Sequence, residues 1–237
     1  MSAILDSGLV MPLAGVALAA YSMPGLAPVC PPIRSLLGIP GRLPHGRGVA
    51  LTFDDGPHPE GTPAVLELLA DAGARATFFV VGEQVERRPE LAAEIAAAGH
   101  ELGLHCHRHR NPLRLTPWQV LDDLRRAASV IADATGCEPR LYRPPYGVFS
   151  AASLVAARRN GWMPLLWSRW GRDWERLATP SSIARRLLRD LRAGDVLLLH
   201  DADYYSAPGS WRRTVAALPR ILEELELRAL PAVQWEG

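Results

Sequence analysis

The chain has 237 residues, 48% of them hydrophobic, which is enough for one large domain with a sizeable core and too few for two comfortable ones. Its formal net charge is +1, so the composition gives no electrostatic reason to expect a nucleic-acid partner. All 26 basic residues are arginines, which excludes a lysine Schiff base and a phosphate-binding P-loop lysine.

Three cysteines are present, at Cys30, Cys106 and Cys137. An odd and sparse set argues against a disulfide framework, and the spacing does not match a zinc knuckle. Cysteine usage therefore does not indicate the cellular compartment.

Residues 1–46 differ in composition from the rest of the chain. Residues 7–33 carry no charge, and 9–20 are mostly apolar, a length that fits a signal-peptide core better than a membrane span of about 20 apolar residues. The stretch is preceded by Asp6 and by no Lys or Arg, which argues against a secretory leader. Five prolines within 12–32 would interrupt a long helix. A secreted or membrane-anchored leader and an intracellular extension packed on the domain are equally favoured, each followed by a Pro/Gly-rich connector.

From Gly48 onward, strand and helix patterns alternate. Strands are predicted over 49–53, 76–82, 101–104, 141–142, 163–169, 195–199 and 230–235, and helices over 62–73, 89–99, 116–136, 151–160, 179–194 and 212–227. The strands are continuous apolar runs, which favours a parallel sheet covered on both faces. With about seven β/α units, the pattern predicts an α/β fold of the incomplete or distorted TIM-barrel type. An open doubly wound sheet is the alternative.

Five polar segments each follow a short apolar run. They are Asp54-Asp55, His105 to His109, Arg143 to Tyr146, Asp173-Trp174 and His200-Asp201. Because the carboxyl ends of parallel strands meet at one face of a barrel, these side chains are expected to converge on one pocket. The set suits a metal-dependent hydrolase.

The histidine segment indicates a metal site. His105 and His109 are spaced i and i+4, which places two imidazoles on one side of a helical turn. His107 points elsewhere in that case and is not expected to be a ligand, although an extended segment would put all three on one face. One carboxylate of Asp54-Asp55 would complete a three-ligand site with open positions, and the other could act as a base. Surface histidines and an exposed Asp-Gly turn are the alternatives.

In this order and spacing, the segments TFDDGP, HCHRH, RPPYG, GRDW and LLLHD resemble the polysaccharide deacetylases of carbohydrate esterase family four. The resemblance extends over about 48–235. It implies a catalytic domain over 47–237 with a distorted (β/α)7 barrel and a divalent metal, most often zinc. It also implies hydrolytic removal of N-acetyl groups from N-acetylglucosamine-containing glycans, such as those of cell walls.

The resemblance also implies residue roles. Asp54 would be the general base, held in place by Arg143, and His200 the general acid, oriented by Asp173. The implied metal ligands are Asp55, His105 and His109. The backbone N–H of Tyr146 would help to bind the oxyanion, and Trp174 and Leu198 would line the acetyl pocket.

Two positions depart from the family pattern. Cys106 stands where a Ser or Thr is usual, and its thiol is a weaker hydrogen-bond donor. Trp170 stands where an acidic residue is common, and this change bears on how the acid strength of His200 is set.

The loop from Asp201 to Trp211 is expected to cover the substrate, since it directly follows the strand that carries His200.

Other functions fit part of the pattern. One alternative is an amidohydrolase of a cyclic amide or a small acetylated metabolite, because barrels change substrate through their loops. A mononuclear iron oxygenase would use the same two histidines and one carboxylate but leaves Asp54, Arg143 and His200 without a role. A carbohydrate-binding module would not need Asp54 and His200. The expected partner is an acetylated glycan or glycoconjugate, with no nucleic acid and with membrane contact only through the N-terminal segment.

Overall fold

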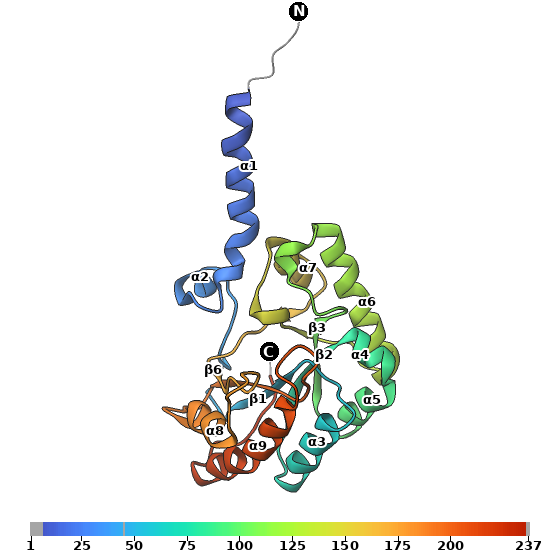
Figure 1. Ribbon diagram of the computed structural model, residues 1–237, viewed down its shortest axis with the longest axis vertical. Coiled ribbons are helices and arrows are strands. Elements are labelled where there is room, and N and C mark those ends of the chain that lie inside the picture. The colour runs from blue at the N-terminus through green and yellow to red at the C-terminus, as the bar shows by residue number, and fades with distance from the viewer. Residues whose placement is uncertain (1–6, 45, 236–237) are drawn as a thin grey trace, which may run out of the picture.

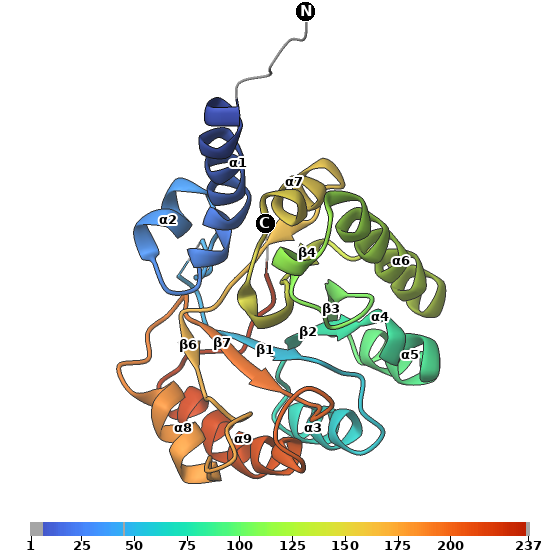
Figure 2. The same ribbon diagram turned by 45° about the horizontal axis from the view of Figure 1, so that its top comes forward.

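The computed structural model describes residues 7–44 and 46–235, and its centre is a parallel sheet with the strand order β5-β4-β3-β2-β1-β7-β6. The strands are β1 Ala50–Asp54, β2 Ala76–Val81, β3 Glu101–Cys106, β4 Leu141–Tyr142, β5 Met163–Pro164, β6 Arg169–Trp170 and β7 Val196–His200. The sheet curls, with the helices on its outer side (Figure 2). This confirms the distorted (β/α)7 barrel rather than a doubly wound sheet.

The central strands form the core because they are apolar along their whole length. Every residue of β1 and β2 is buried, and Phe53 of β1 stacks on its register partner Phe78 of β2 with ring centroids 5.1 Å apart. The outer helices are α3 Gly61–Asp71, α4 Gly82–Arg87, α5 Pro89–Ala97, α6 Pro117–Thr135, α7 Ala151–Arg159, α8 Pro180–Leu188 and α9 Ser210–Leu227.

Local sequence signals fix the ends of the longer helices. Thr116 and Gln119 form a capping box at the start of α6, and the helix ends at Gly136 with φ of 70°, a conformation that glycine adopts without steric cost. Thr179 caps α8 through the backbone N–H of Ser182. The predicted helix over 179–194 was too long, since α8 ends at Leu188.

The predicted strand over 163–169 is two short strands on opposite edges of the sheet. Between β5 and β6 the chain crosses the open side of the curl: the N–H of Leu165 donates to Tyr142 O of β4 (2.9 Å). Further on, the N–H of Ser168 donates to Val196 O of β7 (3.0 Å). The predicted strand over 230–235 was wrong, because Ala232 makes only an isolated bridge to Val49.

The N-terminal segment consists of α1 Ser7–Ser22, a 3-10 turn Met23–Leu26 and α2 Pro31–Leu36. Helix α1 stands away from the barrel (Figure 1). At the base of α1 the Tyr21 hydroxyl donates to Leu115 O (2.7 Å). After α2, Pro40 O accepts from the N–H of Leu166 (2.9 Å). Within the described residues, the structure holds no helix with the length and apolarity needed to cross a membrane.

Candidate functional site

The five polar segments meet at the carboxyl ends of the strands. There a pocket of about 300 Å³ is lined by Asp54, Asp55, His105, His109, Tyr146, Gly147, Trp167, Trp170, Trp174, Leu198, His200, Tyr205 and Ser206. All the site residues expected from the sequence line this pocket except two, Arg143 and Asp173, which are fully buried. The structure therefore brings the whole expected set together at one place.

One carboxylate and two imidazoles form a compact group. Asp55 Oδ1 lies 3.4 Å from His105 Nε2 and 3.3 Å from His109 Nε2, and the three donor atoms lie within 4.8 Å of one another. Asp55 Oδ1 is buried without a hydrogen-bond partner among the described residues, which is costly unless a ligand occupies the space. This donor set and the unpartnered oxygen fit a divalent metal ion.

Charge at this group favours ionised Asp55. Burial alone would raise the pKa of Asp55, but the adjacent His105 and His109 side chains outweigh it and hold that pKa well below its usual range. The left-handed backbone at Asp55, with φ of 80°, turns the chain sharply where β1 ends. Asp54 and Asp55 consequently lie in one pocket although they are neighbours in the chain.

His105 is oriented by the backbone of the next strand. Its Nδ1 lies 2.7 Å from Arg143 O, and because a carbonyl can only accept, Nδ1 carries the proton. Its Nε2 faces Asp55 and, in the neutral ring, would offer its lone pair to a metal ion held between them, the arrangement usual for a metal-binding histidine. His107 turns away from this group: its Nε2 lies 3.8 Å from Glu86 Oε2.

Arg143 is fully buried and joins Asp54 to the open side of the barrel. Its Nη1 donates to Asp54 Oδ1 (2.7 Å) and to Thr52 Oγ1 (2.8 Å). Its Nε and Nη2 donate to the carbonyls of Leu165 and Leu166, each at 3.1 Å. The guanidinium also lies over the Phe79 ring, 4.0 Å from its centroid. Asp54 is therefore held by a side chain that also fixes the crossing segment.

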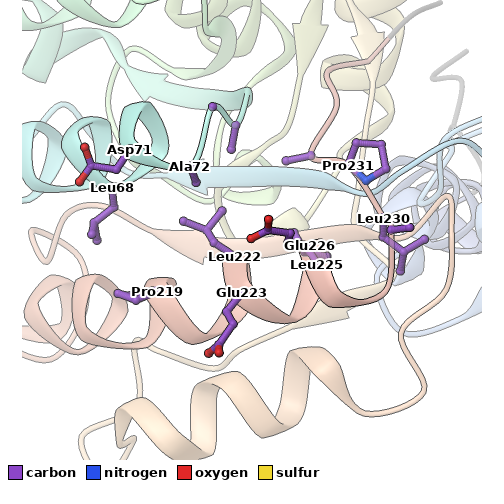
Figure 3. Close-up of a pocket in the computed structure, with 14 residues that line it drawn as sticks. Leu68, Asp71, Ala72, Pro219, Leu222, Glu223, Leu225, Glu226, Leu230 and Pro231 are labelled. Atoms are coloured by element: carbon purple, nitrogen blue, oxygen red, sulfur yellow. The ribbon is translucent and has the colours of Figure 1, made fainter.

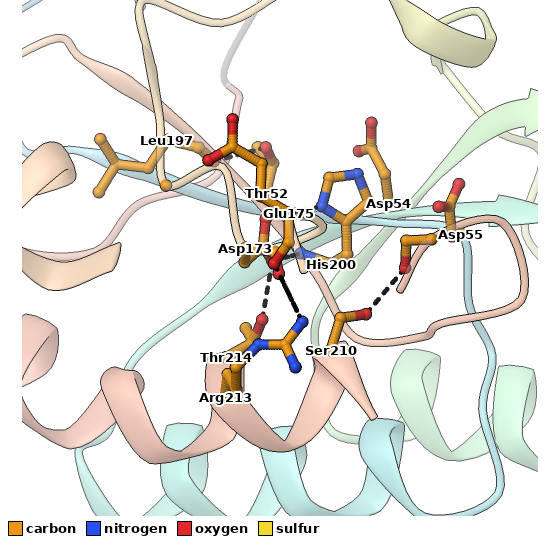
Figure 4. Close-up of polar contacts among 12 residues, drawn as sticks. Thr52, Asp54, Asp55, Asp173, Glu175, Leu197, His200, Ser210, Arg213 and Thr214 are labelled. Atoms are coloured by element: carbon orange, nitrogen blue, oxygen red, sulfur yellow. Dashed lines mark hydrogen bonds and ion pairs between the residues drawn. The ribbon is translucent and has the colours of Figure 1, made fainter. Parts of the chain in front are cut away.

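His200 forms a tight pair with Asp173 (Figure 4). Its Nδ1 lies 3.0 Å from Asp173 Oδ1, and its backbone N–H donates to Oδ2 (2.7 Å). The hydroxyl of Thr214 in α9 also donates to Oδ2 (2.7 Å). Burial alone would lower the pKa of His200, but the charge and hydrogen bond of Asp173 outweigh it and raise the pKa to about 10. The imidazole is therefore a charged donor at neutral pH.

Aromatic rings form one wall of the pocket. Trp174 meets His200 edge-on, with ring centroids 5.3 Å apart. Trp170 lies between Trp174 and Trp167, at 5.7 Å and 5.8 Å. Leu198 is buried beneath them. Trp170, which replaces the acidic residue common in the family pattern, therefore makes this wall continuous and apolar.

Tyr146 also lines the pocket, from a 3-10 turn Pro145–Gly147. Its backbone is left-handed, with φ of 61°. The two backbone hydrogen bonds of this turn are donated by Gly147 to Pro144 O and by Val148 to Pro145 O. Among the described residues, the N–H of Tyr146 is thus left for a ligand in the pocket.

Two features of the site carry weak sequence signals. Tyr205, from the loop after β7, lies flat on His109 with ring centroids 4.1 Å apart, and nothing in the local sequence distinguishes it from a loop anchor. Asp201 is buried behind the Asp54-Asp55-Gly56 turn and accepts a hydrogen bond from Thr62 Oγ1. Burial raises the pKa of Asp201 to about 7. The substrate-cover loop does reach the pocket, through Tyr205 and Ser206.

A wider hollow of about 770 Å³ lies elsewhere, between α3 and α9 (Figure 3). It is lined mainly by leucine, proline and alanine side chains together with Asp71, Glu223 and Glu226. None of the residues expected to carry chemistry borders it. The smaller pocket at the strand ends is therefore the candidate site.

Known proteins are similar to this chain in sequence and in fold. Residues 42–165 match the family model described as polysaccharide deacetylase. A peptidoglycan-N-acetylglucosamine deacetylase of Bacillus cereus is 37% identical over 75% of this chain and 81% of the relative. A chitooligosaccharide deacetylase of Bradyrhizobium sp. is 37% identical over 81% of this chain and 86% of the relative.

Among solved structures, a peptidoglycan N-acetylglucosamine deacetylase in complex with 4-naphthalen-1-yl-N-oxidanyl-benzamide aligns with a TM-score of 0.78. It is 28% identical, and the alignment covers 84% of this chain and 92% of the other. Sequence match, fold and the converging side chains agree. The chain belongs to the polysaccharide deacetylase family.

Proposed function

We propose that residues 47–237 form a metal-dependent hydrolase that removes N-acetyl groups from N-acetylglucosamine-containing glycans. One observation carries the proposal: the Asp54–Arg143 and His200–Asp173 pairs face one pocket beside the Asp55–His105–His109 group. This supplies a base, an acid and a metal site within reach of one amide. Amide hydrolysis needs all three, since water must lose a proton and the leaving amine must gain one.

A divalent metal, most often zinc for such ligands, would be held by Asp55, His105 and His109 and would supply a Lewis acid and a bound water of lowered pKa. Asp54 would accept the proton of the attacking water. Arg143 occupies Asp54 Oδ1, so the other carboxylate oxygen is left for that proton. The fixed guanidinium also prevents Asp54 from turning toward the ligand positions.

His200 would donate a proton to the departing amine. Its Nδ1 is held by Asp173, which leaves Nε2 as the donor toward the pocket. The backbone N–H of Tyr146 would stabilise the oxyanion, a contribution of about 3 kcal/mol for one well-placed donor. Trp174 and Leu198, both lining the pocket, would receive the methyl group of the acetyl.

The substrate class follows from the relatives and the wall. The two curated relatives are named for peptidoglycan and for chitooligosaccharide, and both substrates carry N-acetylglucosamine. An aromatic wall of the kind formed by Trp170 and Trp174 suits the apolar face of a sugar ring. The family match favours hydrolysis over the iron oxygenase alternative, which gives the Asp54–Arg143 and His200–Asp173 pairs no role.

Acetate release tests the proposal. Zinc-loaded protein is incubated with N-acetylglucosamine oligomers, peptidoglycan and small acetylated glycosides, and a chelated sample is the control. We expect acetate from at least one glycan, lost on chelation and restored by zinc. If one zinc is bound per chain and only small acetylated compounds or cyclic amides react, the glycan assignment is wrong.

A further inference from the structure

The two histidines of the metal group are oriented in different ways. His105 has its second ring nitrogen bonded to Arg143 O at 2.7 Å. The corresponding atom of His109, Nδ1, is buried and has no hydrogen-bond partner among the described residues. Metal-binding histidines almost always donate this second N–H to an oxygen, which fixes the plane of the ring. Among the described residues, the plane of His109 is therefore left to a different kind of contact.

Tyr205 makes that contact. Its ring is nearly parallel to the imidazole of His109, with centroids 4.1 Å apart and an interplanar angle of 8°. On another side of the imidazole, Tyr146 approaches edge-on, with centroids 4.8 Å apart and an angle of 74°. Offset stacking and edge contacts are the preferred geometries of aromatic pairs.

The Tyr205 ring is itself fixed from outside the loop that carries it. Its hydroxyl donates to Glu83 Oε1 (2.8 Å) and accepts from Gln84 Nε2 (3.1 Å). Both partners belong to α4, which follows β2, and Gln84 is buried. The loop after β7 thus spans the pocket and is bonded on its far side, so Tyr205 is not a freely rotating surface group.

We propose that Tyr205 is a positioning residue for the metal site: its anchored ring sets the plane of His109 in place of the missing hydrogen bond. This inference rests on the proposed metal group. Tyr205 supplies no ligand atom and no proton. It keeps His109 Nε2 directed at the position shared with Asp55 and His105, and its effect is on metal affinity and on the geometry at the metal.

The test measures zinc affinity directly, by competition with a chromophoric chelator, for the full chain and for Tyr205→Ala and Tyr205→Phe. Losing the orienting partner of a ligand typically costs about 10–100-fold in metal affinity, and we expect a loss in that range for Tyr205→Ala. Tyr205→Phe keeps the stacked ring and loses only the two hydroxyl bonds, so it should restore most of the affinity. Visible spectra of the cobalt-substituted proteins should change for Tyr205→Ala and not for Tyr205→Phe.

Tyr204→Phe is the matched control, because Tyr204 lies in the same loop and packs near His58, with centroids 5.3 Å apart, and phenylalanine keeps its edge contact with the Tyr205 ring. It should leave zinc affinity unchanged. If Tyr205→Ala does not fold, Tyr205→Leu, which keeps the bulk without the flat ring, should show the same loss. If zinc affinity is unchanged in Tyr205→Ala and Tyr205→Leu while the wild type binds one zinc, the role of Tyr205 is overturned and the metal group is not. A wild type that binds no zinc would overturn the metal group itself.

Discussion

Asp54 and His200 are register partners in the parallel pairing of β1 and β7. The proposed base and acid therefore stand side by side on adjacent strands, whose spacing of about 4.8 Å is set by the hydrogen bonds of the sheet. Their separation does not depend on a loop. Both side chains line the same pocket.

Replacing Asp54 by Asn should abolish turnover while leaving the metal bound. Asn keeps an oxygen that can accept from Arg143, and the three ligand side chains are untouched, but the proton acceptor is gone. We expect kcat to fall by about 10²–10⁴-fold with zinc affinity close to that of the wild type. Asp55→Asn is the contrasting control and should lose zinc as well. Full activity of Asp54→Asn would contradict the assignment of the base.

Arg143→Met should destabilise the fold as well as the site. The change leaves the buried Asp54 carboxylate unpaired and removes the donors to Leu165 O and Leu166 O. Breaking one partner of a buried ion pair costs about 3–5 kcal/mol, measurable as the free energy of unfolding in urea. Arg140→Met is the control, since the Arg140 side chain is 80% exposed and its Nη2 lies 3.5 Å from Glu101 Oε1. This variant should lose about 0–1 kcal/mol of the free energy of unfolding.

The pH dependence of activity should report the Asp173–His200 pair. Asp173 raises the pKa of His200 to about 10, so the acid stays protonated through the neutral range. Asp173→Asn removes the charge, and the alkaline limb of kcat/KM against pH should move toward the ordinary histidine value of about 6.5. Thr214→Val, which keeps the charge of Asp173, should move it much less.

The same pair should affect stability in a defined pH window. The pKa of His200 is higher in the folded protein than its value of 6.5 without neighbours. Its contribution to the free energy of unfolding is therefore fully present below pH 6.5 and is lost as the pH rises toward about 10. The wild type should lose more stability than Asp173→Asn across this interval. An equal loss in the two proteins would contradict the raised pKa.

Asp201→Asn should stabilise the protein at alkaline pH. Burial raises the pKa of Asp201 from 3.8 to about 7, so the folded state prefers the neutral acid. This contribution is present below pH 3.8 and is lost as the pH rises through about 7. Asparagine is neutral at every pH, and its advantage in melting temperature should be larger near pH 8 than near pH 5. Asp190→Asn, at an exposed carboxylate, should show no such difference.

The sequence was sufficient for the central strands and for the convergence of the polar segments. Buried parallel strands are apolar along their whole length, and their ends carry the chemistry, so β1, β2, β3 and β7 and the residues after them could be located from pattern alone. The crossing over 163–169 could not, because an apolar run does not reveal which neighbours its residues will meet. Helix α4 has six residues, too few for a helical period to stand out.

The role proposed for Tyr205 had no local signal either. Its ring meets His109, and its hydroxyl meets Glu83 and Gln84. These partners come from two segments of the chain, both distant in sequence from Tyr205. Only the folding of the curled sheet brings them together. A tyrosine in a polar loop looks the same in sequence whether it stacks on a sugar, anchors the loop or orients a ligand.

The double attachment of Arg143 has a consequence for how this enzyme could change over generations. The same guanidinium bonds Asp54 and the segment that crosses the open side of the barrel. We therefore expect substitutions of Arg143 to be removed by misfolding even in a lineage that no longer uses the reaction. Replacement of Asp55, whose Oδ1 has no hydrogen-bond partner among the described residues, should harm the fold less. Loss of activity by drift would begin at the metal group and leave the arginine behind.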